Sequence, residues 1–288
     1  KLPLIFVFRL LARASLATLH RLGALLGWLT WLASPTYRRH LRENMTLALG
    51  ADGARRVRNA AIANAGRTSL ELPRLWLHPL EETVRLVREV RGWDYVEAAQ
   101  AAGKGILFLT PHLGCFEVTA QYYSHRAPIS VLYRPPKQAW LQTMIEEGRA
   151  RPQLYLAPAD LSGVRTLIKA LRRGEAVGML PDQAPRRGEG RWIDFFGRPA
   201  YTMTLAGKLS ESGAAVVLAW GERLPDGAGF RLHFMPPEHP VEGSVEERAA
   251  CISREMERLI LKCPEQYLWG YNRYKQRRGT EPAPDSES

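Results

Sequence analysis

The sequence predicts an α/β fold in which a central, mostly parallel or mixed sheet is flanked by helices. Short apolar runs recur along the chain, and segments with the apolar periodicity of helices lie between several of them. The 288 residues, of which 45% are hydrophobic and 9% aromatic, suit one large packed domain and exclude a wholly disordered chain. We expect that domain at residues 34–278, after an apolar helix at residues 1–33 and before a disordered polar tail at residues 279–288.

The apolar residues 1–33 are interrupted by Arg9, Arg13, His20 and Arg21, so no uncharged run reaches the roughly 18–20 residues of a confident membrane span. On a helix that turns about 100° per residue, Arg9, Arg13 and His20 share one polar stripe. This pattern favours a helix that lies in a membrane interface with its arginines toward the headgroups. A tilted single span and an ordinary core helix are the alternatives.

Residues 34–92 are predicted to be helical, with a helix that starts near Asp52 and is kinked or ended by Pro73. Strands and helices alternate beyond that segment, with Asp160 and Ser244 as helix N-caps. Strands are predicted at residues 105–110, 129–133, 176–180, 192–196, 215–220 and 230–234. Helices are predicted at residues 93–102, 116–124, 139–149, 161–173, 202–212 and 245–261. This alternation predicts a sheet covered by helices on both faces.

The chain carries a formal net charge of +11, with a sequence pI of about 9.9. A basic excess of this size favours a polyanionic partner, such as nucleic acid, an anionic membrane or a phosphorylated substrate. The three cysteines are odd in number and lack C-x-x-C spacing, which argues against a disulfide scaffold and against a zinc site. We therefore expect no bound metal and a reducing compartment.

The segment of residues 109–117, LTPHLGCFE, carries the most chemical information. His112 follows a buried strand, and open α/β sheets place ligand sites at the carboxyl ends of their strands. Glu117 comes five residues later, in the first turn of the next helix. We expect the loop to fold back so that Glu117 holds Nδ1 of His112 and leaves Nε2 free to accept a proton. An acidic residue that only caps the helix start is the alternative, and Cys115 is interpreted as packing.

Four ordered blocks resemble the lipid A biosynthesis acyltransferases, the secondary or late lauroyl/myristoyl transferases of Gram-negative bacteria. The family's His-x4-Asp/Glu motif matches His112 and Glu117, and its Tyr-Arg-Pro segment matches residues 133–135. Its Asp-Gln block matches residues 180–183, followed by FFGRPA at residues 195–200. Its carboxy-terminal block matches PEQYLW at residues 264–269, with Arg273 and Lys275 beyond. The resemblance covers nearly the whole chain after the first helix.

The resemblance implies a fold like that of the glycerol-phosphate acyltransferases. It also implies transfer of a fatty acyl group from a thioester, usually on acyl carrier protein, to a hydroxyl of a lipid A precursor. His112 would be the general base, with Glu117 orienting it. No G-x-S-x-G nucleophile elbow is present, which favours direct attack without an acyl-enzyme. We expect no cofactor beyond acyl carrier protein or coenzyme A as donor, and a place on the cytoplasmic face of a bacterial inner membrane, among its lipids.

Further candidates for binding substrate or an oxyanion follow other predicted strands. Arg134 and Asp182 should converge on the rim that holds His112. Arg134 would stabilise the oxyanion or hold a phosphate, and Asp182 would orient Arg134 or line the acceptor site. A pair that only secures the sheet edge is the alternative. Gln183 has a similar status, and Arg273 is expected to close the same cleft.

Arg186, Arg187 and Arg191 form a basic loop beside that rim. They would bind the phosphates of the lipid A disaccharide or the acidic helix of a carrier protein, unless the loop is merely solvated.

Three other functions compete with this interpretation. Mycobacterial enzymes that transfer acyl groups from coenzyme A to phosphatidylinositol mannosides share the His-x4-Asp/Glu motif. Glu117, Gln183 and the carboxy-terminal block favour the lipid A branch. A nucleic-acid-binding protein is supported by charge alone, because no zinc, helix-turn-helix or RNA-binding pattern is present. A non-catalytic membrane-binding module accounts for the first helix but not for the four blocks.

Overall fold

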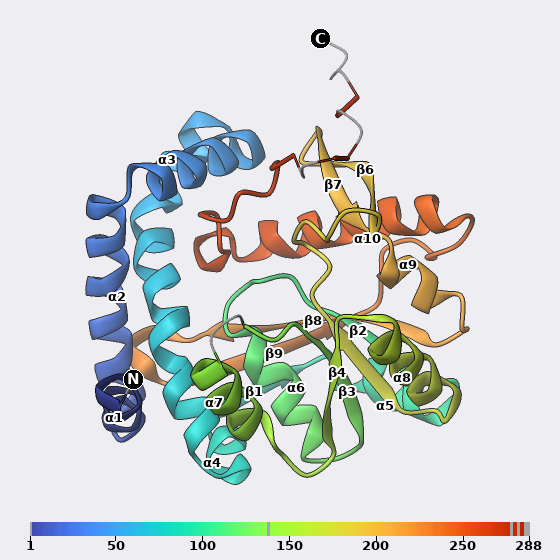
Figure 1. Ribbon diagram of the computed structural model, residues 1–288, viewed down its shortest axis with the longest axis horizontal. Helices are drawn as coiled ribbons and strands as arrows, with labels where there is room; N and C mark the ends of the chain where they lie inside the picture. The colour runs from blue at the N-terminus through green and yellow to red at the C-terminus, as the bar shows by residue number, and fades with distance from the viewer. Residues whose placement is uncertain (1, 137–138, 277–278, 281–282, 285–288) are drawn as a thin grey trace.

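The computed structural model describes residues 2–136, 139–276, 279–280 and 283–284 (Figure 1). Its main sheet has seven strands in the order β1-β9-β8-β2-β5-β3-β4. All neighbouring pairs are parallel except β8 with β9. The strands are β1 Val87–Arg91, β2 Ile106–Leu109, β3 Ile129–Tyr133, β4 Leu154–Pro158, β5 Ala176–Met179, β8 Ala215–Arg223 and β9 Phe230–Met235. The predicted α/β fold with a mostly parallel, mixed sheet is confirmed.

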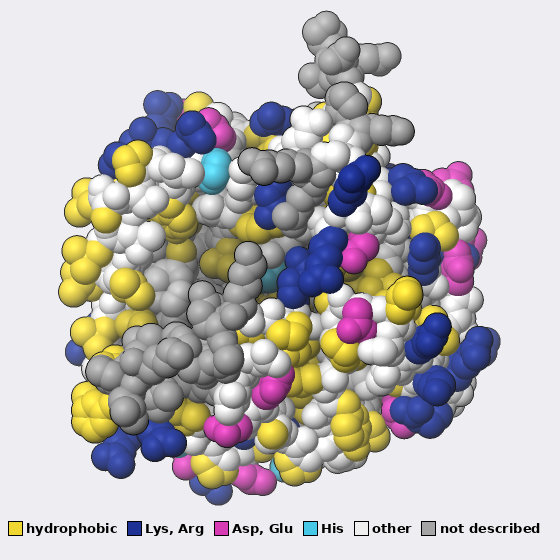
Figure 2. All heavy atoms as spheres, in the orientation of Figure 1, with side chains coloured by type: hydrophobic (Ala, Val, Ile, Leu, Met, Phe, Trp, Pro, Cys, Tyr) yellow, Lys and Arg dark blue, Asp and Glu magenta, His cyan; other side chains and the backbone are white. Residues whose placement is uncertain are grey.

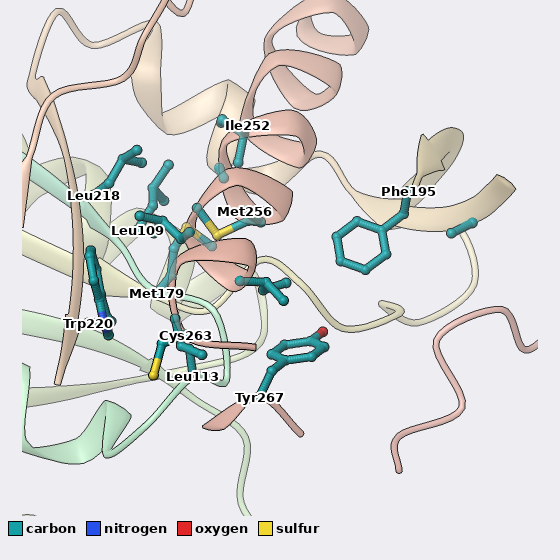
Figure 3. Packing of buried hydrophobic residues seen from close by; sticks show 14 of the residues in the cluster. Leu109, Leu113, Met179, Phe195, Leu218, Trp220, Ile252, Met256, Cys263 and Tyr267 are labelled. Carbon is teal, nitrogen blue, oxygen red and sulfur yellow. The ribbon is translucent and has the colours of Figure 1, made fainter. Parts of the chain in front are cut away.

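Helices cover both faces of the sheet. The helices after the first strand are α5 Trp93–Ala101, α6 Phe116–Ser124, α7 Ala139–Arg149, α8 Leu161–Arg172, α9 Leu205–Ser210 and α10 Val245–Lys262. β2 shows the two-sided burial, because Ile106 and Phe108 join one hydrophobic cluster and Leu107 and Leu109 join the other. In Figure 3, Leu109 and its neighbours in the sheet lie against side chains of α10. The carboxyl end of β2 therefore rests on a packed core.

Residues 1–33 do not form the single helix that the sequence predicted. The described part folds into α1 Leu2–Ala12 and α2 Leu16–Ala33, because Ser15 adopts an extended conformation and its side chain caps α2 by accepting from the Thr18 amide. α2 packs along the long helix α3, Pro35–Leu77 (Figure 1). A Cβ atom on Gly66 would lie 1.9 Å from the carbonyl oxygen of Gly23, so this close approach requires glycine.

Within the described part of the chain, no helix combines the length and the apolar character needed to cross a membrane.

α3 departs from the prediction at its expected start, and Pro73 does not end it. The break lies at Gly50, whose φ of 68° is left-handed, rather than at Asp52. Pro73 lies inside the helix, which continues to Leu77 before α4, Leu80–Arg85. The expectation that residues 34–92 are helical is wrong for β1, whose short, arginine-containing sequence pairs with β9 at the edge of the sheet. The strand is stabilised by backbone hydrogen bonds to β9, and its own sequence pattern does not predict a strand.

A two-stranded antiparallel arm, β6 Gly190–Phe195 and β7 Arg198–Met203, projects from the main sheet toward α10 (Figure 1). The predicted strand at residues 192–196 corresponds to β6. The helix predicted at residues 202–212 is shorter, because the chain is still paired in β7 up to Met203. β4 and β7 were not predicted.

Candidate active site

Three neighbouring strands end at the same edge of the sheet. β5 lies between β2 and β3 and is parallel to both, so the residues that follow these strands share one rim. His112 follows β2, Asp182 follows β5 and Arg134 follows β3. The predicted convergence of these residues on one rim is confirmed.

The His112 ring is held by Asp182. Nδ1 of His112 lies 2.7 Å from Oδ1 of Asp182, and the His112 backbone amide donates to Oδ2 at 2.9 Å. The Asp182 side chain is buried, whereas the His112 side chain is 19% exposed. Because a carboxylate accepts, Nδ1 carries the proton and Nε2 presents its lone pair. Nε2 has no hydrogen-bond partner among the residues that the structure describes.

Two further contacts fix the loop that carries His112. The His112 carbonyl accepts from the Leu268 amide at 3.2 Å, and its ring meets Phe116 edge-on at 5.1 Å between centroids. Gly114, with a φ of 58°, brings the loop close to β8, where a Cβ would lie 2.1 Å from the Gly221 carbonyl oxygen. The imidazole is thus positioned before any substrate arrives.

Electrostatics keep Asp182 ionised. Burial alone would raise the pKa of Asp182, but the positive charge that His112 carries when protonated and its two hydrogen bonds, with a contribution from Arg273, bring that pKa below its ordinary value. An ionised Asp182 can stabilise an imidazolium at His112. This is the electrostatic arrangement of a histidine that takes up a proton during a reaction.

Glu117 does not reach His112, so the expected contact with Nδ1 is wrong. The buried Glu117 carboxylate accepts from the Arg149 guanidinium, with Nε to Oε2 at 3.0 Å, and from the Trp76 indole at 3.2 Å. Its place in the first turn of α6 directs it toward α3 and α7, while Asp182 occupies the position beside the imidazole.

Arg149 is the partner of Glu117, and sequence reasoning did not anticipate it. Burial disfavours its charged form, but Glu117 outweighs this and the pKa of Arg149 is raised above its ordinary value. Its guanidinium also lies over the rings of Trp76 and Tyr133, at 5.7 and 5.6 Å. No local motif marks Arg149, because its partner Glu117 lies 32 residues away on another helix.

The other predicted residues lie at different depths around the rim. Arg134 is exposed, and Gln183 is half-buried beside a cavity of about 320 Å³ between α2, α3 and Leu268. Arg186 and Arg187 are exposed, as the basic-loop interpretation expected.

The side chains of Arg191 and Arg273 contact other residues of the fold. Arg191 pairs with Glu246 of α10 at 3.1 Å. Arg273 is buried, and its guanidinium donates to the Tyr201 carbonyl at 2.9 Å and to the Thr202 hydroxyl at 2.6 Å. Arg273 therefore secures the β6–β7 arm to the carboxy-terminal segment rather than presenting an open guanidinium to a substrate.

Three histidines outside the motif have acidic partners in the structure. His20 meets Glu71, His78 meets Glu82 and His233 meets Glu222. Glu71 lies 51 residues from His20 and Glu222 lies 11 residues from His233, whereas Glu82 lies only four residues from His78. The buried position of His20 also removes it from the expected polar stripe, whereas Arg9 and Arg13 are exposed.

A histidine on a buried carboxylate at the carboxyl edge of an α/β sheet is a site suited to proton transfer. Comparison with known proteins gives the class of enzyme, which is an acyltransferase. A sequence model of the bacterial lipid A biosynthesis acyltransferases matches residues 4–276. The chain belongs to this family.

Relatives within the family agree over most of the chain. The lipid A biosynthesis lauroyltransferase of Escherichia coli (strain K12) is 30% identical over 268 residues, covering 90% of this chain and 86% of that protein. The lipid A biosynthesis palmitoleoyltransferase of the same strain is 28% identical, covering 74% of this chain and 69% of that protein. A phosphatidylinositol mannoside acyltransferase of Mycobacterium tuberculosis (strain CDC 1551 / Oshkosh) is 27% identical, covering 62% and 58%.

Proposed function

We propose that this enzyme transfers a fatty acyl group from acyl carrier protein to a hydroxyl of a lipid A precursor, with His112 as general base. The observation that carries the proposal is the His112–Asp182 pair, in which Nδ1 is held at 2.7 Å and Nε2 is open. An alcohol is a weak nucleophile at neutral pH and needs a base positioned at its proton. The similarity to lipid A acyltransferases supplies the substrate class.

The reaction is proposed as a direct transfer. Nε2 of His112 takes the hydroxyl proton while the hydroxyl oxygen forms a bond to the thioester carbonyl carbon. The tetrahedral oxyanion collapses, the carbon–sulfur bond breaks, and the imidazolium returns its proton to the departing thiolate. Asp182 stabilises the imidazolium between these steps.

A cysteine nucleophile is disfavoured in this mechanism. Cys115 is buried at the start of α6, and burial together with the charge of Glu71 raises the pKa of its thiol well above the ordinary value. The reactive form of a cysteine is the thiolate, which this position suppresses.

The amino-terminal helices support attachment to the cytoplasmic face of the inner membrane. The outer face of α2 exposes the apolar residues Leu22, Leu25, Trp28, Leu29 and Leu32. In Figure 2, hydrophobic side chains gather along the edge where Figure 1 places α1 and α2. An exposed apolar helix face near exposed arginines is the pattern of a helix that lies in a lipid interface.

A second candidate acceptor is a mycobacterial-type glycolipid acylated from coenzyme A. The similarity to a phosphatidylinositol mannoside acyltransferase favours it, over a smaller share of the chain. The two functions differ in acceptor, so the acceptor is what an experiment must identify.

The test is mass spectrometry of lipid A from Gram-negative cells that lack a late acyltransferase. Cells that carry the wild-type gene are expected to gain one acyl chain, and cells that carry His112→Ala are expected to gain none. An unchanged lipid A profile with well-expressed wild-type protein, together with acylation of an added phosphatidylinositol mannoside, would move the assignment to the second acceptor.

A further inference from the structure

A second cavity lies on the catalytic rim, about 460 Å³ in volume, at the carboxyl ends of β3 and β4 and against the starts of α8 and α9. Its wall is largely apolar and its rim is basic. The residues that carry these two properties are Leu132, Val164 and Met203 in the wall and Arg134, Arg186 and Lys208 on the rim. An apolar hollow with a few convergent charged groups is the usual form of a binding site for an amphiphilic ligand.

The rim cations form no salt bridge within the described part of the chain. Within the described ranges, the side chains of Arg134, Arg186 and Lys208 make no hydrogen bond or salt bridge, and all three are exposed. The two acidic residues beside them are already engaged by backbone amides. Asp160 caps α8 by accepting from the Ser162 and Gly163 amides, and Glu189 accepts from the Arg186 amide at 3.1 Å. Asp160 and Glu189 keep their negative charges, so the rim, with three cations against two carboxylates, carries a net positive charge that favours an anion.

The cavity lies within reach of the catalytic histidine. Arg134 follows β3, which is separated from β2 by β5 alone, so the ends of β2 and β3 lie about 10 Å apart at roughly 4.8 Å per strand. Residues 182–186 also connect the two places directly, because Asp182 holds His112 and Arg186 lines the cavity. A ligand anchored by its anion in this cavity needs an extended arm to bring a reacting group to Nε2.

The position of the cavity separates it from the lipid side of the enzyme. Figure 1 places α8 and α9 on the opposite side of the sheet edge from α1 and α2. The cavity next to Gln183, lined by Leu26 and Gly27 of α2, is the one that adjoins the exposed apolar helix face. A lipid acceptor delivered along α2 thus approaches His112 from one side and leaves the basic cavity to the water-borne substrate.

We propose that this basic-rimmed cavity binds the phosphate-bearing arm of the acyl donor. The inference rests on the proposed function and names the donor subsite of the same site. Both acyl carrier protein and coenzyme A present the thioester on a phosphopantetheine arm, in which a phosphate precedes a long, weakly polar chain. Arg134, Arg186 and Lys208 pair with the phosphate, the chain crosses the apolar wall, and the thioester reaches His112.

Binding of coenzyme A itself, measured by calorimetry, tests the subsite independently of catalysis. Lys208→Glu and Arg186→Glu are each expected to raise the Kd for coenzyme A roughly 10- to 100-fold, because each loses a charged hydrogen bond and adds a repulsion. Lys169→Glu is the matched control, since it makes the same charge change on the exposed surface of α8 outside the cavity. A Kd that does not change, or that changes equally in the control, overturns the proposal.

Steady-state kinetics then separate donor from acceptor. The two cavity variants are expected to raise KM for acyl-coenzyme A and for acyl carrier protein alike, with KM for the lipid acceptor unchanged. A rise confined to the acceptor overturns the donor assignment, and a rise confined to carrier protein assigns the charges to a protein surface instead of the arm. Wild-type protein that binds coenzyme A but transfers no acyl group would contradict the proposed function and leave the subsite supported.

Discussion

Two pairs of a histidine and a buried carboxylate occupy different layers of this molecule. His112 and Asp182 join two loops at the edge of the sheet, with Nδ1 and Oδ1 2.7 Å apart. His20 and Glu71 join α2 to α3, with Nε2 and Oε2 3.2 Å apart. In the second pair the carboxylate also accepts from Arg223 of β8, at 2.8 Å from Nε and 2.6 Å from Nη2.

A third group, Arg223, distinguishes the structural pair from the pair that we propose to be reactive. Glu71 and Arg223 are 0% and 2% exposed, and their ion pair connects α3 to the sheet. Burial would raise the pKa of Glu71, but Arg223 and His20 lower it to about 2. The Glu71 carboxylate is therefore ionised at neutral pH and bound by both partners. Among the described residues, no arginine or lysine donates a hydrogen bond to Asp182, and Nε2 of His112 is open. The two pairs therefore differ in what else the carboxylate binds: Glu71 is also held by Arg223, whereas Asp182 holds the histidine that we propose as the base.

Replacing each histidine by alanine is expected to give the largest difference between the two pairs. His112→Ala is expected to lower kcat about 10²- to 10⁴-fold, because it removes the proposed base, while unfolding in urea stays cooperative. His20→Ala is expected to lower the free energy of unfolding by about 1–3 kcal/mol and to leave kcat unchanged, because Glu71 keeps Arg223. Acyl transfer and urea unfolding of both variants decide the matter. Full activity in His112→Ala would remove this histidine from the mechanism.

Sequence reasoning found His112 and Asp182 but paired them wrongly. The positions followed from a local rule, since each residue lies in the loop that follows a buried strand. The partner of Nδ1 depended on strand order, because Asp182 is 70 residues from His112 and reaches it only when β5 lies beside β2. A spacing of five residues made Glu117 the nearer carboxylate in sequence. Nothing in the motif indicated that the Glu117 carboxylate would pair with Arg149.

The same limit explains the errors in the fold. α6 and α7 were predicted with their observed bounds, since helical periodicity is local. β1 and β4 were missed because each is a short edge strand whose formation depends on its partner, β9 or β3. The division of residues 1–33 into α1 and α2 depended on Ser15, whose side chain caps α2. The apolar pattern of the segment does not indicate this cap.

A double-mutant cycle extends the comparison to a third buried carboxylate, Glu117, and its ion pair with Arg149. Glu117→Gln and Arg149→Met each leave one buried charge without its partner, so each is expected to lower kcat about tenfold and to reduce stability. The double variant should lose less than the sum, with a coupling of about 0.5–3 kcal/mol, because both changes remove the same ion pair. Urea unfolding and kcat of the four proteins give the cycle.

The opposite result would restore the role that the sequence suggested for Glu117. If Glu117 acted on His112 itself, Arg149→Met would leave kcat intact and the effects of the two changes would add. Trp76 provides an internal control, since a glutamine at position 117 still offers an oxygen to its indole and only the charge is lost.

The smallest expected effect is the acid dependence of stability at Glu71. Its pKa falls from an ordinary 4.5 to about 2 on folding, so its stabilising contribution is complete above about pH 4.5 and is lost as the pH falls toward 2. Glu71→Gln cannot titrate, so its unfolding free energy should be lower than that of the wild type at pH 7 and should fall less steeply between pH 5 and pH 3. Glu43→Gln, an exposed site on the same helix, should leave the wild-type slope in place. Urea unfolding of the three proteins at closely spaced pH values measures these slopes. Equal slopes for Glu71→Gln and the wild type would mean that the buried ion pair with Arg223 does not couple to folding, and the proposed contrast with Asp182 would be lost.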